Sequence, residues 1–316
     1  MENDNANLED IMSQVRVCFE SSHGEQVQIE AVQYSELIDK LIEMNFKIGV
    51  ITKAPLTMSK LSDYNILIIG NPKENYFSDD EINDIKNFVY QGGGLLLIND
   101  QGGDPTNKNN LSKLGSIFGI SFGTNILIND NAQSEDDEQL ITTGNFLNHF
   151  IMRGIEKIAF KSTCALQLVE GDPKAEVNAV VHSGLGTSEI SWNGNAWTES
   201  RKEKYTLVAV SKFGAGKVVA LGTTRILSSL INKKHGILAE DNAKFLSNIF
   251  AWLVNREVYE DGKLKSVFVN VSLKPDVYFW IEKELKENDK FRDFNEIINF
   301  AIESLAVAVE KFRETT

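Results

Sequence analysis

Hydrophobic side chains recur with two periods along the first 255 residues. Short apolar runs, typical of buried β-strands, alternate with longer segments in which every third or fourth side chain is apolar, typical of amphipathic helices. The predicted strands are residues 15–19, 47–51, 64–70 and 95–100, and the predicted helices are residues 31–45, 78–92 and 110–118. Ser78 is the predicted N-cap of the second helix, and acidic residues 79–81 follow in its first turn. This order predicts an α/β fold in which helices cover both faces of a parallel sheet.

Between residues 120 and 225 the pattern changes, and strands dominate. Predicted strands are residues 158–160, 164–169, 177–181, 207–210 and 218–221. Residues 213–217 contain two glycines and predict a hairpin turn, and Trp192 and Trp197 flank a second predicted hairpin turn. The acidic run 134–138 is expected to be an exposed loop, and residues 241–254 form an amphipathic pattern that predicts a closing helix.

A strict alternation of apolar and polar positions marks residues 265–275. Valines and a leucine occupy one predicted face, and the other carries Phe268, Asn270 and Ser272. A single strand leaves its backbone N–H and C=O groups unpaired, and no neighbouring segment is a predicted hairpin partner. We therefore expect this strand to pair with the same strand of a second copy of the chain.

Two helical patterns follow this strand. Pro275 and Asp276 suit a first helical turn, and Val277, Ile281 and Leu285 share one face. A polar turn leads to Asp293 and Glu296, which have the spacing of a capping box. The apolar residues expected to be buried on the second helix are Ile297, Ile298, Ala301, Ile302 and Leu305.

The strand–helix–helix order over about residues 265–310 resembles the ribbon-helix-helix family of DNA-binding dimers. The resemblance implies a homodimer through this region, with double-stranded DNA as a partner. The implied base-contacting residues are Phe268, Asn270 and Ser272, the implied phosphate-contacting residues are Phe294 and Asn295, and Lys265, Lys274 and Arg292 flank them. From Lys263 onwards nine Lys and Arg stand against ten Asp and Glu. Because DNA affinity depends on neutralised phosphates, dimerisation without DNA contact remains an alternative.

Composition and charge limit the partners and the cellular location that we expect for this protein. The 316 residues are 42% hydrophobic and carry a formal net charge of −13, which disfavours broad binding to nucleic acid or anionic membranes. No apolar run is long enough to span a membrane, and the first residues lack a signal-peptide pattern, so we expect a cytoplasmic protein. Cys18 and Cys164 are too isolated for a disulfide framework or a metal motif. The predicted organisation is a domain at 1–255, a linker at 256–264 and a second domain at 265–316.

Four stretches, residues 17–25, 61–70, 78–100 and 214–222, carry a second resemblance. They resemble the class I glutamine amidotransferase-like superfamily, in particular the branch shared by gliding-motility and intraflagellar-transport proteins. This resemblance implies a flavodoxin-like, doubly wound sheet with a strand-rich extension. True amidotransferases need a nucleophilic Cys just after the fourth strand, where this chain has Asp100. The resemblance therefore implies a catalytically inactive domain.

Residues with side chains able to bind a ligand follow two of the predicted strands. Glu20, His23 and Glu25 follow the first strand, and Asp100 and Gln101 follow the fourth, where open sheets bind ligands. A Glu, a His and a Glu within six residues can hold a metal, act as a general base or only order a loop. No second ligand cluster accompanies them, so the sequence assigns no metal and no cofactor. Gly92–Gly94 precedes a strand and Gln101–Asp104 lacks a Lys-Ser/Thr pair, so neither predicts a phosphate site.

These patterns predict a non-enzymatic transcriptional regulator. Its first domain would sense a small ligand or bind another protein, and its second would dimerise and bind DNA. One alternative is an adaptor that only dimerises through its C-terminus. The other is a hydrolase that uses Glu20, His23 and Asp100.

Overall fold

The computed structural model describes residues 15–304, except 193–194, 201–203, 231–233, 255, 261–262, 269–274, 288–290 and 292–295. The chain divides into two compact units, Met1–Asn270 and Val271–Thr316. The first is an α/β unit and the second a helical unit.

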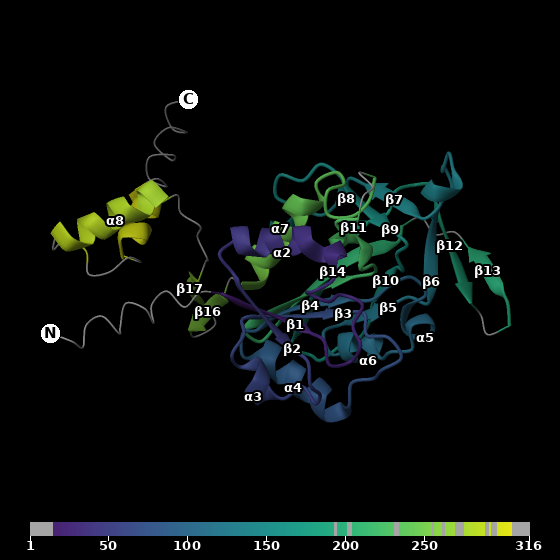
Figure 1. The fold of residues 1–316 in the computed structure, drawn as a ribbon, viewed down its shortest axis with the longest axis horizontal. Helices are drawn as coiled ribbons and strands as arrows, with labels where there is room; N and C mark the ends of the chain where they lie inside the picture. Colours follow the sequence, from purple (N-terminus) through teal and green to yellow (C-terminus); the bar gives the residue numbers. More distant parts are fainter. Residues whose placement is uncertain are drawn as a thin grey trace. The chain divides into compact units, whose positions relative to one another are not determined.

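Strands and helices alternate through the first half of the α/β unit, as the sequence predicts (Figure 1). The strands are β1 (Arg16–Glu20), β2 (Lys47–Ile51), β3 (Ile66–Gly70) and β4 (Gly94–Ile98). The helices are η1 (Val32–Tyr34), α2 (Ser35–Glu43), α3 (Met58–Leu61), α4 (Asp79–Tyr90), α5 (Gly103–Asn107) and α6 (Leu111–Ser116). β1, β3 and β4 lie inside the sheet, and both of their faces are covered. Their sequences are therefore short runs of mostly apolar residues.

The second half is rich in strands, and the predicted hairpins at 213–217 and 192–197 are confirmed. Its strands are β5 (Ile120–Phe122), β6 (Asn125–Asn129), β7 (Leu140–Thr143), β8 (Asn145–Phe146), β9 (Ile158–Lys161), β10 (Leu166–Leu168), β11 (Ala175–His182), β12 (Thr187–Trp192), β13 (Trp197–Ser200), β14 (Thr206–Phe213) and β15 (Gly216–Leu221). Its helices are η2 (Glu135–Asp137), η3 (Phe150–Met152), η4 (Arg225–Leu227) and α7 (Asn242–Val254).

The central sheet has the strand order β2-β1-β3-β4-β15-β14-β10-β5, and β11 also pairs with β14. The strands from β2 to β15 in this order are parallel to one another. From β14 onwards the pairing is antiparallel, so the sheet is mixed rather than purely parallel. The reason is the tight turn between β14 and β15, because a two-residue connection can join only antiparallel neighbours.

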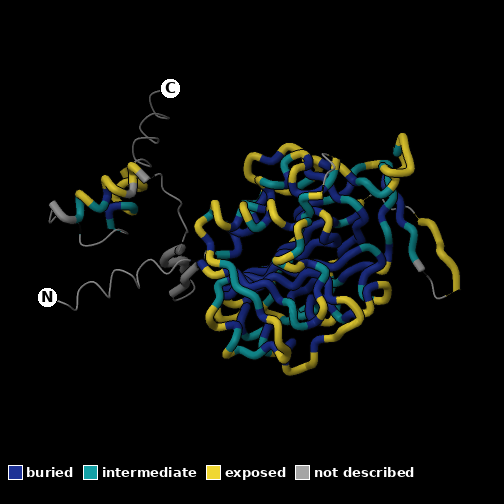
Figure 2. Tube along the Cα trace, viewed as in Figure 1, coloured by how far each residue is buried: buried dark blue, intermediate teal, exposed yellow. Residues whose placement is uncertain are grey.

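Hydrophobic cores cover both faces of the sheet (Figure 2). On one face α2 and α7 contribute Leu37, Leu41 and Ile249. On the other face α3, α4 and α6 contribute Leu61, Ile85 and Leu114. The alternating side chains of β1 divide between the two cores, as a period of two requires.

The connections out of β1 create a switch point in the sheet. After β1 the chain moves to β2 on one side, and after β2 it returns past β1 to β3 on the other. The carboxyl ends of β1 and β3, at Glu20 and Gly70, therefore lie side by side at one edge. In open α/β sheets this is the position where ligands bind.

A hairpin near the end of the α/β unit corrects the interpretation of residues 256–275. β16 (Arg256–Glu260) pairs antiparallel with β17 (Lys263–Phe268). The expected linker is therefore largely a strand, and the strand expected to need a second copy has its partner in the same chain. In the sequence, Asp261-Gly262 stands between the two strands, and Asp-Gly between apolar segments is a strong hairpin signal.

Two helices are described in the helical unit: α8 (Pro275–Glu287) and residues 296–304. The predicted start at Pro275 is confirmed. Ile281 and Ile297 are buried as predicted, but Ala301 and Ile302 are exposed, so the predicted buried face of the second helix is confirmed only in part. Leu305 and the predicted cap at Asp293 lie outside the described residues. No described helix of the chain is long and apolar enough to cross a membrane.

Candidate functional site

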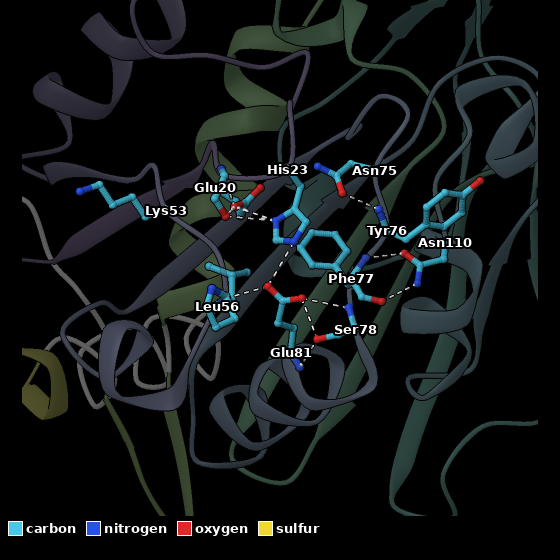
Figure 3. A network of polar contacts seen from close by, with 12 residues as sticks. Glu20, His23, Lys53, Leu56, Asn75, Tyr76, Phe77, Ser78, Glu81 and Asn110 are labelled. Atoms are coloured by element: carbon cyan, nitrogen blue, oxygen red, sulfur yellow. Dashed lines mark hydrogen bonds and ion pairs between the residues drawn. The ribbon is translucent and has the colours of Figure 1, made fainter.

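The loop after β1 places His23 between two carboxylates (Figure 3). Its Nδ1 lies 3.2 Å from Oε1 of Glu20, and its Nε2 lies 3.1 Å from Oε1 of Glu81. Glu25 accepts the backbone N–H of His23 at 3.2 Å. Gly24 has a left-handed φ of 69°, which lets the loop turn back so that Glu25 forms a bridge to Pro72 after β3.

Glu81 comes from the first turn of α4, more than fifty residues away in sequence. It forms a capping box with Ser78, whose backbone N–H donates to Oε2 at 2.9 Å. The N–H of Leu56 donates to Oε1 at 2.8 Å. Burial opposes ionisation of Glu81, but these backbone donors, the Ser78 hydroxyl and His23 outweigh it and lower the pKa of Glu81.

His23 is itself buried, and its ring lies 4.2 Å from the Phe77 ring, centroid to centroid. Burial alone lowers the pKa of His23, but the hydrogen bond to Glu20 and the charges of Glu20 and Glu81 reverse the direction and raise it. A protonated imidazole can donate to both carboxylates. The ligand atoms of Glu20, His23 and Glu25 lie within 4.8 Å of one another, so these three residues are also the described residues able to hold a metal ion.

Asp100 belongs to a separate polar group at the ends of β4 and β15. It accepts the N–H of Gln101 at 2.9 Å and the hydroxyl of Thr224 at 3.3 Å. Burial raises the pKa of Asp100, and Gln101, the positive charges of Lys73 and Arg225, and Thr224 only partly oppose this. Glu20 and His23 share a hydrogen bond, whereas none of the described hydrogen bonds or ion pairs joins Asp100 to either of them.

A network of buried amides fills the edge between these two groups, and the sequence analysis missed it. Asn99 donates to Asp104 at 2.7 Å, Asn107 donates to Asn99 at 3.0 Å, and Asn109 donates to Asn71 at 3.1 Å. The repeated asparagines at 107–110, close after a buried strand, were the available signal. Because these side chains satisfy one another, they fix the ends of β3 and β4.

The two cysteines lack the environment of a nucleophile. Burial raises the pKa of Cys18 to about 12, and it also raises the pKa of Cys164. Both thiols are therefore protonated near neutral pH. Two described cavities, of about 470 and 370 Å³, lie near His149 and Asn129, and neither is lined by Glu20, His23 or Asp100.

The predicted DNA-contacting residues are not tested by the structure. The backbones of Lys265 and Phe268 lie in β17, but their side chains are not described. The others, Asn270, Ser272, Lys274, Arg292, Phe294 and Asn295, lie outside the described residues. DNA contact remains a prediction.

Comparison with known proteins gives a family and a fold. The model of the family described as "Domain of unknown function (DUF4350)" matches residues 41–250. The solved mmIFT52 N-terminal domain is 20% identical with a TM-score of 0.61, over 77% of this chain and all of that one. Thua-like proteins from Bacteroides uniformis and Parabacteroides merdae are 14% and 10% identical, each with a TM-score of 0.43. They cover 76% and 80% of this chain, and 90% and 92% of their own. No curated protein matches.

Both family resemblances drawn from the sequence were wrong. The matching family is neither the glutamine amidotransferase-like nor the ribbon-helix-helix family, and the strand that carried the second resemblance pairs within its own chain. The motifs were misleading because glycine turns beside apolar strands occur in many open α/β sheets, and a β-α-α pattern is short. The DUF4350 model spans well over half of the chain. The chain belongs to the DUF4350 family of domains of unknown function.

Proposed function

We propose that this protein is a non-enzymatic adaptor that self-associates through its helical unit. The observation that carries this proposal is a set of large apolar side chains that are exposed on the two described helices of that unit. Phe279 is 65% exposed, Trp280 55% and Ile302 57%, and Val277 and Phe300 are exposed as well. We call these five residues the aromatic surface. Several large apolar side chains exposed within one small unit favour contact with another protein.

The size of the helical unit favours a second copy as the partner. The unit spans residues 271–316, and units this small seldom bury enough apolar area to be stable alone. Disulfides or a Cys/His metal site are the usual remedies, but the sequence from 271 to 316 contains neither Cys nor His. Association with another protein is the remaining way for this unit to bury more apolar area. A second copy of the chain supplies the same aromatic surface in a twofold-symmetric contact.

The carboxyl edge of the α/β unit supports an adaptor over a hydrolase. The side chains expected to act as catalysts there belong to separate buried groups. His23 contacts Glu81, and Asp100 accepts the hydroxyl of Thr224. General acid–base catalysis needs such groups within hydrogen-bond reach of one substrate. In this proposal the α/β unit is a rigid body that the helical unit carries into an assembly.

Light scattering after size-exclusion chromatography tests the proposal on the full-length protein. We expect twice the mass of one chain for the wild type and the mass of one chain for the double variant Phe279→Glu/Trp280→Glu, because a charge in an apolar contact is costly. Leu185→Glu is the matched control, since Leu185 is highly exposed but lies in the α/β unit. We expect it to keep the wild-type mass.

Two outcomes would refute the proposal. A wild-type protein that stays monomeric at high micromolar concentration has no self-association to explain. A double variant that keeps the wild-type mass would place the contact elsewhere. Circular dichroism of each variant verifies that the helices have formed.

A further inference from the structure

Three polar atoms in the loop after β1 are buried without a hydrogen-bond partner in the described part of the chain. They are Oε2 of Glu20, Oγ of Ser21 and Oε1 of Glu25. Each carboxylate uses only its other oxygen: Glu20 accepts from the N–H of Ser22 at 2.7 Å, and Glu25 from the N–H of His23. The exposed fractions of Glu20 and Glu25 are 0% and 1%. Unsatisfied buried carboxylate oxygens are unfavourable and therefore indicate a missing partner.

The positions of these groups suit a cation. One ligand atom from each of Glu20, His23 and Glu25 lies within 4.8 Å of the others. In a metal site with bonds of about 2.0–2.3 Å, two ligand atoms lie at most roughly 4–4.6 Å apart. An ion among the three residues therefore needs only a slight contraction of the loop.

We infer that Glu20, His23 and Glu25 bind one divalent transition-metal ion, Mn²⁺ or Zn²⁺, at the carboxyl end of β1. A set of one imidazole and two carboxylates suits these ions, whereas Mg²⁺ and Ca²⁺ prefer ligands that are all oxygen. The site would anchor the loop that follows β1 beside the end of β3, at the switch point of the sheet.

Glu81 has the position of an orienting group for this site. It faces Nε2 of His23 at 3.1 Å, which leaves Nδ1, on the side of Glu20, to bind the ion. Metal-binding histidines usually donate their second N–H to a carboxylate in this way. The N–H donors of Leu56 and Ser78 and the N-terminus of α4 hold Glu81 in place.

Charge balance also favours a cation. Glu20, Glu25 and Glu81 are buried around a single imidazole, which supplies at most one positive charge. A divalent ion neutralises Glu20 and Glu25 while His23 stays neutral, and the helix terminus stabilises the charge of Glu81. This inference does not depend on the adaptor proposal, since no residue of the helical unit takes part.

The test uses untagged full-length protein that has been stripped with EDTA and dialysed. Isothermal titration with MnCl₂ and with ZnCl₂, near pH 7.5, should give one ion per chain for at least one metal, and that metal should raise the melting temperature. Glu20→Gln and Glu25→Gln keep the side-chain volume but remove the charge, and each should weaken binding at least about 100-fold. Glu30→Gln is the control, because Glu30 is exposed and lies in the same segment between β1 and η1.

Folding of the variants must be established before their binding is interpreted. Without metal, Glu25→Gln should melt no lower than the wild type, because it removes a buried charge. Glu81→Gln should keep one ion per chain but bind it about 10–100-fold more weakly, as expected for an orienting group. Absence of stoichiometric binding of both metals to the stripped wild type would overturn the inference. Equal binding by the wild type and both carboxylate variants would do the same.

Discussion

Two buried carboxylates of the α/β unit have pKa shifts in opposite directions. Backbone donors and His23 surround Glu81 at the start of α4, and they lower its pKa in spite of burial. Asp100 accepts only two described hydrogen bonds, and burial raises its pKa. The difference follows from the number of donors that each carboxylate meets, since a charge without enough donors is unstable in a protein interior.

Asp100→Asn should therefore make the protein more stable near neutral pH. Burial raises the folded pKa of Asp100 above the ordinary 3.8 of an Asp side chain, so the native state holds this proton more tightly than the unfolded chain. The wild type consequently loses stability as pH rises from about 3.8 through the folded pKa, and an amide avoids this loss. Urea unfolding should show a gain in stability at about pH 7 that shrinks towards about pH 4.

Asp39→Asn is the control for this experiment, because Asp39 is exposed on α2. It should change stability little at either pH. A destabilised Asp100→Asn variant near neutral pH would mean that the attraction of Lys73 and Arg225 outweighs burial.

At the scale of single elements, α4 shows how far a local signal reaches. The sequence predicts its cap at Ser78 and its acidic first turn, and the structure confirms both. What the sequence does not reveal is that Glu81, at position N3 of the capping box, also contacts Leu56 and His23. A helix cap is a local pattern of three or four residues, whereas these contacts depend on how α3 and β1 pack beside α4.

Ser78→Ala should destabilise the α/β unit by about 1 kcal/mol, the usual cost of losing a helix N-cap. The Ser78 hydroxyl accepts the N–H of Glu81 at 3.3 Å and donates to its carboxylate at 2.8 Å, and alanine can do neither. Chemical unfolding measures the loss. Ser59→Ala, at an exposed position inside α3, should change the free energy of unfolding by no more than a few tenths of a kcal/mol. Equal effects of the two substitutions would contradict the role of the cap.

The hairpin of β16 and β17 shows the limit of an argument from one strand. Strict alternation at 265–273 correctly indicated a strand, which the structure describes as far as Phe268. The alternation does not indicate the partner, because every strand offers the same backbone groups for pairing. The preceding segment, Arg256–Glu260, lies closest along the chain, and it is the partner of β17.

At the scale of the whole molecule, the two units differ in how their apolar residues are buried. The α/β unit has a core on each face of its sheet, whereas the helical unit exposes the aromatic surface. A stop codon after Asn270 should therefore leave the α/β unit folded, with a calorimetric melting temperature within a few degrees of the full-length value. The same truncation should abolish self-association. An unfolded fragment would show that the α/β unit depends on the last 46 residues.

The sequence by itself determined the alternation of strands and helices, the cap of α4, the hairpin turn at 213–217 and the absence of a usable cysteine nucleophile. These features depend on patterns within a few residues, because side-chain period, turn chemistry and capping are local. Only the tertiary structure decided that Glu81 meets His23, that Asp100 belongs to another group and that the sheet turns antiparallel at β14. Such contacts depend on strand order and on which faces are buried together, and no short stretch of sequence contains that information.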